Sequence, residues 1–145
     1  MMRHEIIDRF LGEIGVAEKP GTTANSPRIL EYFDATDYDW VKTDETAWCS
    51  AFVNWLAWSC GLERSGELNA RSWLSVGHEV KVPERGDLVI FWREDPDSWK
   101  GHVGLWIRQE GSLIWTGGGN QKNKVGIDPY PADRVLGYRH LPRIA

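Results

Sequence analysis

The chain has 145 residues, of which 41% are hydrophobic and 26% are charged, a balance typical of one globular domain with a sizeable core. Its formal net charge of −4 excludes the basic footprint of a nucleic-acid-binding protein. It holds two cysteines and no cysteine–histidine spacing suited to zinc, so we expect neither a disulfide framework nor a metal site.

The N-terminal part of the chain has helical patterning. Apolar residues recur at helical spacing over residues 3–14 and predict an amphipathic helix that ends near Gly15. Asn25 or Ser26 can cap a second short helix that carries Pro27 in its first turn. The first residues carry charges and no long apolar run, so we expect neither a signal peptide nor membrane insertion.

Residues 48–61 form the most apolar stretch of the chain. On a helical wheel Ser50 and Asn54 fall close together, and apolar side chains occupy most of the remaining circumference. This pattern predicts a buried helix, and Gly61 suits a left-handed cap just past its end.

A cysteine lies at each end of this helix. Cys49 falls in the first turn, where free N–H groups and the helix dipole favour a thiolate. Cys60 follows eleven residues later, about 16 Å away along a helix and beyond disulfide reach. We therefore expect two free thiols, Cys49 as a candidate nucleophile and Cys60 as a core residue.

After Pro83 the hydrophobic pattern changes from the helical period to apolar runs and alternation, which predict strands. A short helix over residues 69–76 precedes this change. The expected strands span residues 88–92, 102–107, 113–116, 125–130 and 135–138. Helices followed by an antiparallel sheet indicate an α+β fold. We expect a single domain with a helical lobe over about residues 1–80 and a β-sheet lobe over about 85–141.

Three polar side chains complete a pattern that suits cysteine hydrolases. His102 opens one expected strand, and Asn120 follows three glycines at the end of the next. In a hairpin these two residues approach the same end of the sheet. Asn120 could then hold the ring of His102, which would keep Cys49 as a thiolate.

Four ordered motifs carry a resemblance to a known family. They are Trp-Cys-Ser-Ala-Phe-Val-Asn-Trp at 48–55, Gly-Asp-Leu-Val-Ile-Phe-Trp at 86–92, Gly-His-Val-Gly at 101–104 and Gly-Gly-Asn-Gln at 118–121. Together they resemble the CHAP branch of the NlpC/P60 and CHAP superfamily of papain-like peptidoglycan hydrolases, and are similar to its compact phage- and prophage-associated group. The resemblance covers about residues 5 to 140.

The resemblance implies a papain-like fold with Cys49 as nucleophile, His102 as base and Asn120 as the orienting residue. Two positions depart from the patterns of the superfamily. Many CHAP enzymes have a glutamate where this chain has Gly118, and NlpC/P60 enzymes often place a polar residue where it has Ile114. The second departure favours the CHAP version of the site.

Residues near these motifs are candidates for substrate binding. The chain has nine tryptophans, a residue common where extended ligands dock. The triple glycine offers room for the backbone to pass close to a substrate or to the histidine ring. Asp44 could orient a substrate or cap the approach to the central helix. The expected substrate-binding residues are Trp48, Asp44, Trp92, Trp99, Trp106, Gly118 and Gln121.

The resemblance implies a cysteine hydrolase that cleaves amide bonds in peptidoglycan, as a stem-peptide endopeptidase or an N-acetylmuramoyl-L-alanine amidase, by a Cys-His-Asn mechanism without a cofactor. We expect a monomer that is made in the cytoplasm and reaches the cell wall after release or delivery. A delivery, holin or immunity protein could be a further partner. Two alternatives stay open. One is a non-catalytic wall- or ligand-binding module on the same scaffold, and the other is a cysteine protease or acyltransferase with a non-wall substrate.

Overall fold

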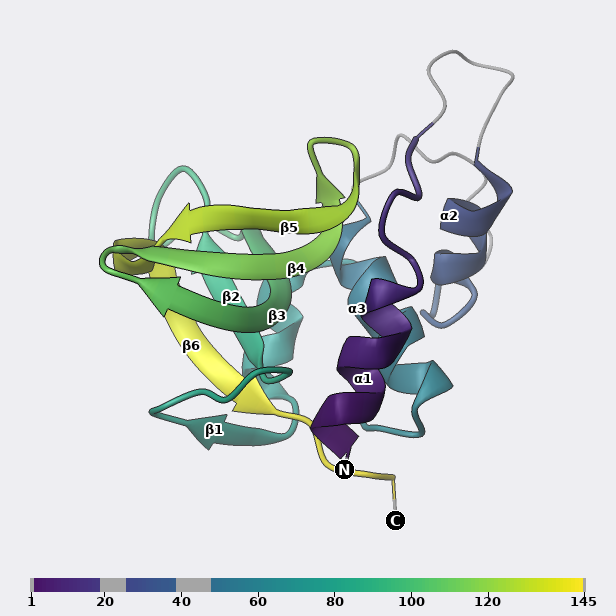
Figure 1. Ribbon diagram of the computed structural model, residues 1–145, viewed down its shortest axis with the longest axis horizontal. Coiled ribbons are helices and arrows are strands. Elements are labelled where there is room, and N and C mark those ends of the chain that lie inside the picture. The colour runs from purple at the N-terminus through teal and green to yellow at the C-terminus, as the bar shows by residue number, and fades with distance from the viewer. Residues whose placement is uncertain (1, 19–25, 39–47, 145) are drawn as a thin grey trace.

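The computed structural model describes residues 2–18, 26–38 and 48–144, and it places the α-helices on one side of a sheet (Figure 1). The α-helices are α1 (Met2–Leu11), α2 (Pro27–Phe33) and α3 (Cys49–Ser59). Two short 3-10 helices are η1 (Ala70–Ser75) and η2 (Ala132–Arg134). The strands are β1 (His78–Val80), β2 (Leu88–Trp92), β3 (Gly101–Glu110), β4 (Leu113–Gln121), β5 (Lys124–Pro131) and β6 (Val135–His140). The expected α+β class is confirmed.

The six strands form one sheet in the order β1-β6-β2-β3-β4-β5, and every neighbouring pair is antiparallel. Strands β2 and β3 lie at its centre, and β2 is buried over Leu88–Phe91 as its apolar run predicted. Strand β1 was not predicted, because its three residues show no apolar alternation and are held by pairing with the end of β6.

The helix ends follow their sequence signals in two of three cases. Ser26 caps α2 by accepting a hydrogen bond from the Ile29 N–H at 3.4 Å. Gly61 adopts a φ of +69° just past α3, as predicted for a left-handed cap. Helix α1, in contrast, ends at Leu11, and turns occupy the residues that lead to Gly15.

Helix α3 is buried along most of its length and carries the two polar residues predicted to lie together. Ser50 Oγ donates to the Glu67 carbonyl at 2.6 Å and accepts from Trp73 Nε1 at 2.9 Å. Asn54 Oδ1 accepts from the Gly66 N–H at 2.8 Å. These bonds satisfy polar groups inside the core and fix the first half of α3 against η1 and the loop before it.

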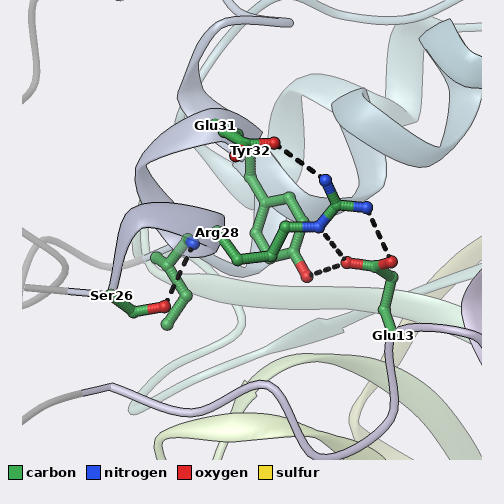
Figure 2. A network of polar contacts seen from close by, with 6 residues as sticks. Glu13, Ser26, Arg28, Glu31 and Tyr32 are labelled. Atoms are coloured by element: carbon green, nitrogen blue, oxygen red, sulfur yellow. Dashed lines mark hydrogen bonds and ion pairs between the residues drawn. The ribbon is translucent and has the colours of Figure 1, made fainter.

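A charged network ties α2 to the turn after α1 (Figure 2). The buried carboxylate of Glu13 accepts two hydrogen bonds from Arg28, at 2.7 and 2.8 Å, and one from the Tyr32 hydroxyl at 2.6 Å. The ring of Tyr32 in turn packs on Phe52 of α3, with centroids 4.9 Å apart. The network therefore sets the position of α3 as well as that of α2.

Two apolar clusters lie on the two faces of the sheet. The larger one joins the helices to alternate strand residues such as Leu88, Ile90 and Val103. The smaller one consists of Val89, Phe91 and Ile114 and has half-buried aromatic rings packed against it. This division follows the two-residue period of the strands. Among the described helices, none combines the length and the apolar character that a membrane crossing requires.

Candidate active site

Cys49 is the first residue of α3 and is only 7% exposed. The residue before it, Trp48, occupies the N-cap position and offers no side-chain hydrogen bond to the helix. The N–H groups of the first turn therefore receive no hydrogen bond from an N-cap side chain and can act on a negative charge at this helix end.

The surroundings of Cys49 favour its thiolate. Burial raises the pKa of this thiol, but a hydrogen bond from the His102 side chain and the charge on that ring lower it. The backbone N–H groups of Val103 and Ser50 lower the pKa further, so that it lies below the ordinary value for cysteine. The fold thus joins the predicted nucleophile and the predicted base, which come from α3 and β3.

The residue that holds the His102 ring is Gln121, where the sequence analysis expected Asn120. Gln121 Oε1 lies 3.0 Å from His102 Nε2. The amide nitrogen of Gln121 donates to the carbonyls of Thr116 and Gly126 and to Asp128 Oδ2, at 3.0, 3.1 and 3.0 Å. Three acceptors around the nitrogen leave the amide oxygen to face the ring.

This amide orientation determines the tautomer of His102. Because the amide oxygen of Gln121 can only accept, Nε2 of His102 must carry a hydrogen. The other ring nitrogen, Nδ1, is then free to exchange a proton with Cys49. Gln121 is only 1% exposed and contacts the ring of His102, while its expected contact with substrate stays a prediction.

The expectation for Asn120 fails because the strand is irregular at this point. Its backbone has a φ of +56°, and the register between β4 and β5 shifts between Gly118 and Gln121. Among the described contacts, none joins the Asn120 side chain to the ring of His102. Asn120 instead lines the pocket beside His102.

The glycines before Asn120 make room for the protein's own side chains. A Cβ on Gly118 would lie 2.7 Å from Gln121 Oε1, and one on Gly119 would lie 2.6 Å from the Trp48 ring. Gly118 thus admits the amide that holds His102, and Gly119 admits the residue that precedes Cys49. The expected contact of Gly118 with substrate stays a prediction beside this packing role.

Tyr130 of β5 is a site residue that the sequence analysis missed. Its ring stacks on His102, with centroids 4.8 Å apart and an angle of 14° between the planes. It also stacks on Phe91, with centroids 5.1 Å apart. Burial raises the pKa of Tyr130, and the charges of Asp128 and Cys49 add to this rise. No spacing signal links a tyrosine near the end of the chain to His102, because the contact depends on the pairing of β4 with β5.

A pocket of about 270 Å³ opens beside His102. Its wall includes Trp92, as the sequence analysis expected, and also Asn120 and Tyr130. The guanidinium of Arg134 lies over the Trp92 ring, 4.8 Å from its centroid. A molecule that occupied this hollow would lie beside His102.

The other predicted substrate contacts lie elsewhere. Trp48 is fully buried and donates through Nε1 to Glu18 at 2.7 Å, so it is a core residue. Trp106 packs half-buried against the cluster around Phe91. Trp99 is 70% exposed on the loop before β3 and is outside the pocket wall. Asp44 lies outside the described residues.

Cys60 serves as an internal comparison for Cys49. Both cysteines are free, and Cys60 is 8% exposed. Burial raises the pKa of Cys60, which is opposite to the net shift at Cys49. Cys60 is therefore the buried core thiol that the sequence predicted. Among the described residues, no group of three or more acidic, cysteine and histidine side chains could hold a metal ion.

Comparison with known proteins adds one finding to this geometry. A family model described as the CHAP domain matches residues 41–121, more than half of the chain. The matched segment contains Cys49, His102 and Gln121. No curated protein matches the sequence.

Proposed function

Because the chain belongs to the CHAP family of papain-like amidase and peptidase domains, we propose that it cleaves amide bonds in peptidoglycan with Cys49 as its nucleophile. The bond would be one in the stem peptide, the amide between the sugar and L-alanine, or a cross-bridge. The observation that carries the proposal is the lowered pKa of Cys49 beside a His102 ring whose far nitrogen bonds Gln121.

In this proposal the resting site holds a thiolate on Cys49 and an imidazolium on His102. The thiolate sulfur attacks the carbonyl carbon of the scissile amide and forms a carbon–sulfur bond. As the carbon–nitrogen bond breaks, His102 Nδ1 gives its proton to the leaving amine. A thioester remains on Cys49, and the neutral ring of His102 is ready to act as a base.

Water completes the proposed cycle. His102 Nδ1 takes a proton from the water as its oxygen attacks the thioester, and the Cys49 thiolate leaves. This step releases the acid product and restores the ion pair. Backbone N–H groups at the start of α3 are candidates to hold the oxyanion of both tetrahedral intermediates, where each donor is worth about 3–4 kcal/mol in known cases.

Purified peptidoglycan provides the direct test. We expect Cys49→Ala to lose all turnover while its circular dichroism spectrum and melting temperature stay near those of the parent. The matched control is Cys60→Ala, a substitution at an equally buried thiol that should retain activity. Lysis by Cys49→Ala at the parent rate would overturn the proposal. Mass spectrometry of the released fragments identifies the bond, and a wall that is bound but never cleaved would indicate the binding-module alternative.

A further inference from the structure

The pocket beside His102 carries a concentration of positive charge. Arg93, Lys122 and Arg134 all line it, and among the described residues of its wall there is no aspartate or glutamate. The chain as a whole is acidic, with 21 acidic and 17 basic residues, so this local balance is opposite to the overall one. Such a pocket attracts an anionic group.

Two of these three cations keep their charge available. Lys122 Nζ lies 3.3 Å from Asp128 Oδ1 and is thereby partly neutralised. The guanidinium of Arg134 lies over Trp92, which restrains the side chain without neutralising it. Among the described residues, neither Arg93 nor Arg134 has a carboxylate within ion-pair distance.

The two arginines come from elements that the sheet brings together. Arg134 is the last residue of η2 and directly precedes β6. The first residue of β6, Val135, pairs with Phe91 of β2, and Arg93 follows two residues later. The positive charge of Arg93 also reaches the site, since it opposes the rise in the pKa of Tyr130. Both arginines therefore border the same hollow as His102.

We propose that Arg93 and Arg134 form a carboxylate-binding subsite, which selects substrates with a free carboxylate close to the scissile amide. Planar guanidinium groups match a carboxylate in geometry and in charge. Peptidoglycan stem peptides offer such groups, on the α-carbon of D-glutamate and at the peptide C-terminus. The pocket, at about 270 Å³, is small and suits a short peptide segment better than a glycan chain. This subsite rests on the proposed function and defines its substrate class.

The test uses a muramyl tetrapeptide of L-alanine, D-glutamate, L-lysine and D-alanine in three forms. One form has both carboxylates free, and each of the other two has one carboxylate converted to a carboxamide. With the parent enzyme, we expect one amidation to lower kcat/KM by about 10- to 100-fold, mainly through KM. In the double variant Arg93→Gln/Arg134→Gln, the same amidation should change kcat/KM by less than about threefold.

The control variant is Arg108→Gln. Arg108 is an exposed arginine that, like Arg134, lies over a tryptophan ring, with its guanidinium 5.7 Å from the centroid of Trp115. It is not part of the pocket wall. It should keep the parent preference. Equal cleavage of all three forms by the parent enzyme would refute the subsite and leave the proposed hydrolase intact.

A binding measurement separates failure of the subsite from failure of the hydrolase. Calorimetry with Cys49→Ala compares the free and amidated peptides without turnover. Cys49→Ala should prefer one free carboxylate by about tenfold or more. If replacement of Arg93 and Arg134 in the same background abolishes this preference, the subsite is supported even when no peptide is cleaved. Equal affinity for all three forms, or a preference that survives both replacements, overturns it.

Discussion

Replacing Gln121 by methionine tests which residue positions the His102 ring. Methionine has a similar length and can fill the buried space, but it cannot accept the hydrogen bond from Nε2 that spans 3.0 Å. The ring then loses its fixed tautomer and orientation, while Cys49 and the pocket wall keep their own side chains. We expect kcat to fall and KM to change little, because the substrate pocket does not include Gln121.

The size of the loss follows from this one hydrogen bond. A hydrogen bond to a charged group contributes about 1.5–3 kcal/mol, and His102 is charged in the resting ion pair. Since about 1.4 kcal/mol corresponds to a tenfold change in rate, kcat should decrease by about 10- to 100-fold. The substitution also removes a donor from the Thr116 and Gly126 carbonyls, so the melting temperature should fall as well.

The assay compares Gln121→Met with Asn120→Gly on purified peptidoglycan, at a temperature where both variants are folded. Glycine tolerates the φ of +56° at position 120, so this control removes the side chain without straining the turn. A second readout is the alkylation rate of Cys49 at neutral pH. It should fall in Gln121→Met, because a misplaced His102 supports the thiolate less, and a merely unstable protein would not show this effect.

The reverse result would refute this assignment. If Asn120→Gly lost more than tenfold in kcat and Gln121→Met stayed within about threefold, Asn120 would be the orienting residue. The resting hydrogen bond of Gln121 would then have only a structural role.

Three further predictions concern the same structure. Iodoacetamide at neutral pH should label Cys49 before Cys60. The two thiols are equally buried, at 7% and 8% exposed, but the pKa of Cys49 is lowered and that of Cys60 is raised. Peptide mass mapping that finds Cys60 modified first would contradict the ion pair. The rate of hydrolysis should follow a bell-shaped pH profile, because Cys49 must be ionised and His102 protonated. The acid limb should lie below the ordinary thiol pKa, since the pKa of Cys49 is lowered. Activity that still rises above about pH 10 is incompatible with this requirement. Glu13→Gln should destabilise the fold by about 2–3 kcal/mol at neutral pH, as measured by urea unfolding. Glu31→Gln should cost less than about 1 kcal/mol, because Glu31 is the exposed partner of the same Arg28. Because the pKa of Glu13 is lowered in the folded state, its stabilisation is complete above the unfolded value near 4.5 and should vanish as the pH falls through the lower folded value.

The sequence predicts well those elements whose cause is local. The apolar run of β2, the Ser26 cap of α2 and the Gly61 cap of α3 each depend on a few neighbouring residues, and each is present. Strand β1 depends on pairing with β6, more than fifty residues away in the sequence, and its own residues carry no signal. Local patterns therefore predict the elements but miss those that long-range pairing creates.

The tryptophans show a similar limit. Their number and their grouping around Cys49 and His102 suggest a binding groove, yet Trp48 is fully buried and Trp99 lies outside the pocket wall. A tryptophan has enough apolar surface to serve a core or a groove equally well. Only its position relative to the sheet decides between these uses, and Trp92 faces the pocket because it ends a central strand beside His102.

The difference between Asn120 and Gln121 has a definite structural cause. A regular strand alternates its side chains, so a one-residue change in register exchanges the residue that faces a given neighbour. Here the register between β4 and β5 shifts between Gly118 and Gln121, and Asn120 takes a left-handed backbone conformation. Glycine at position 118 leaves the space that the Gln121 amide fills, since a Cβ there would lie 2.7 Å from its oxygen. Any side chain at position 118 would therefore crowd the amide that contacts His102, and a glutamate there would compete with Gln121 for the same space.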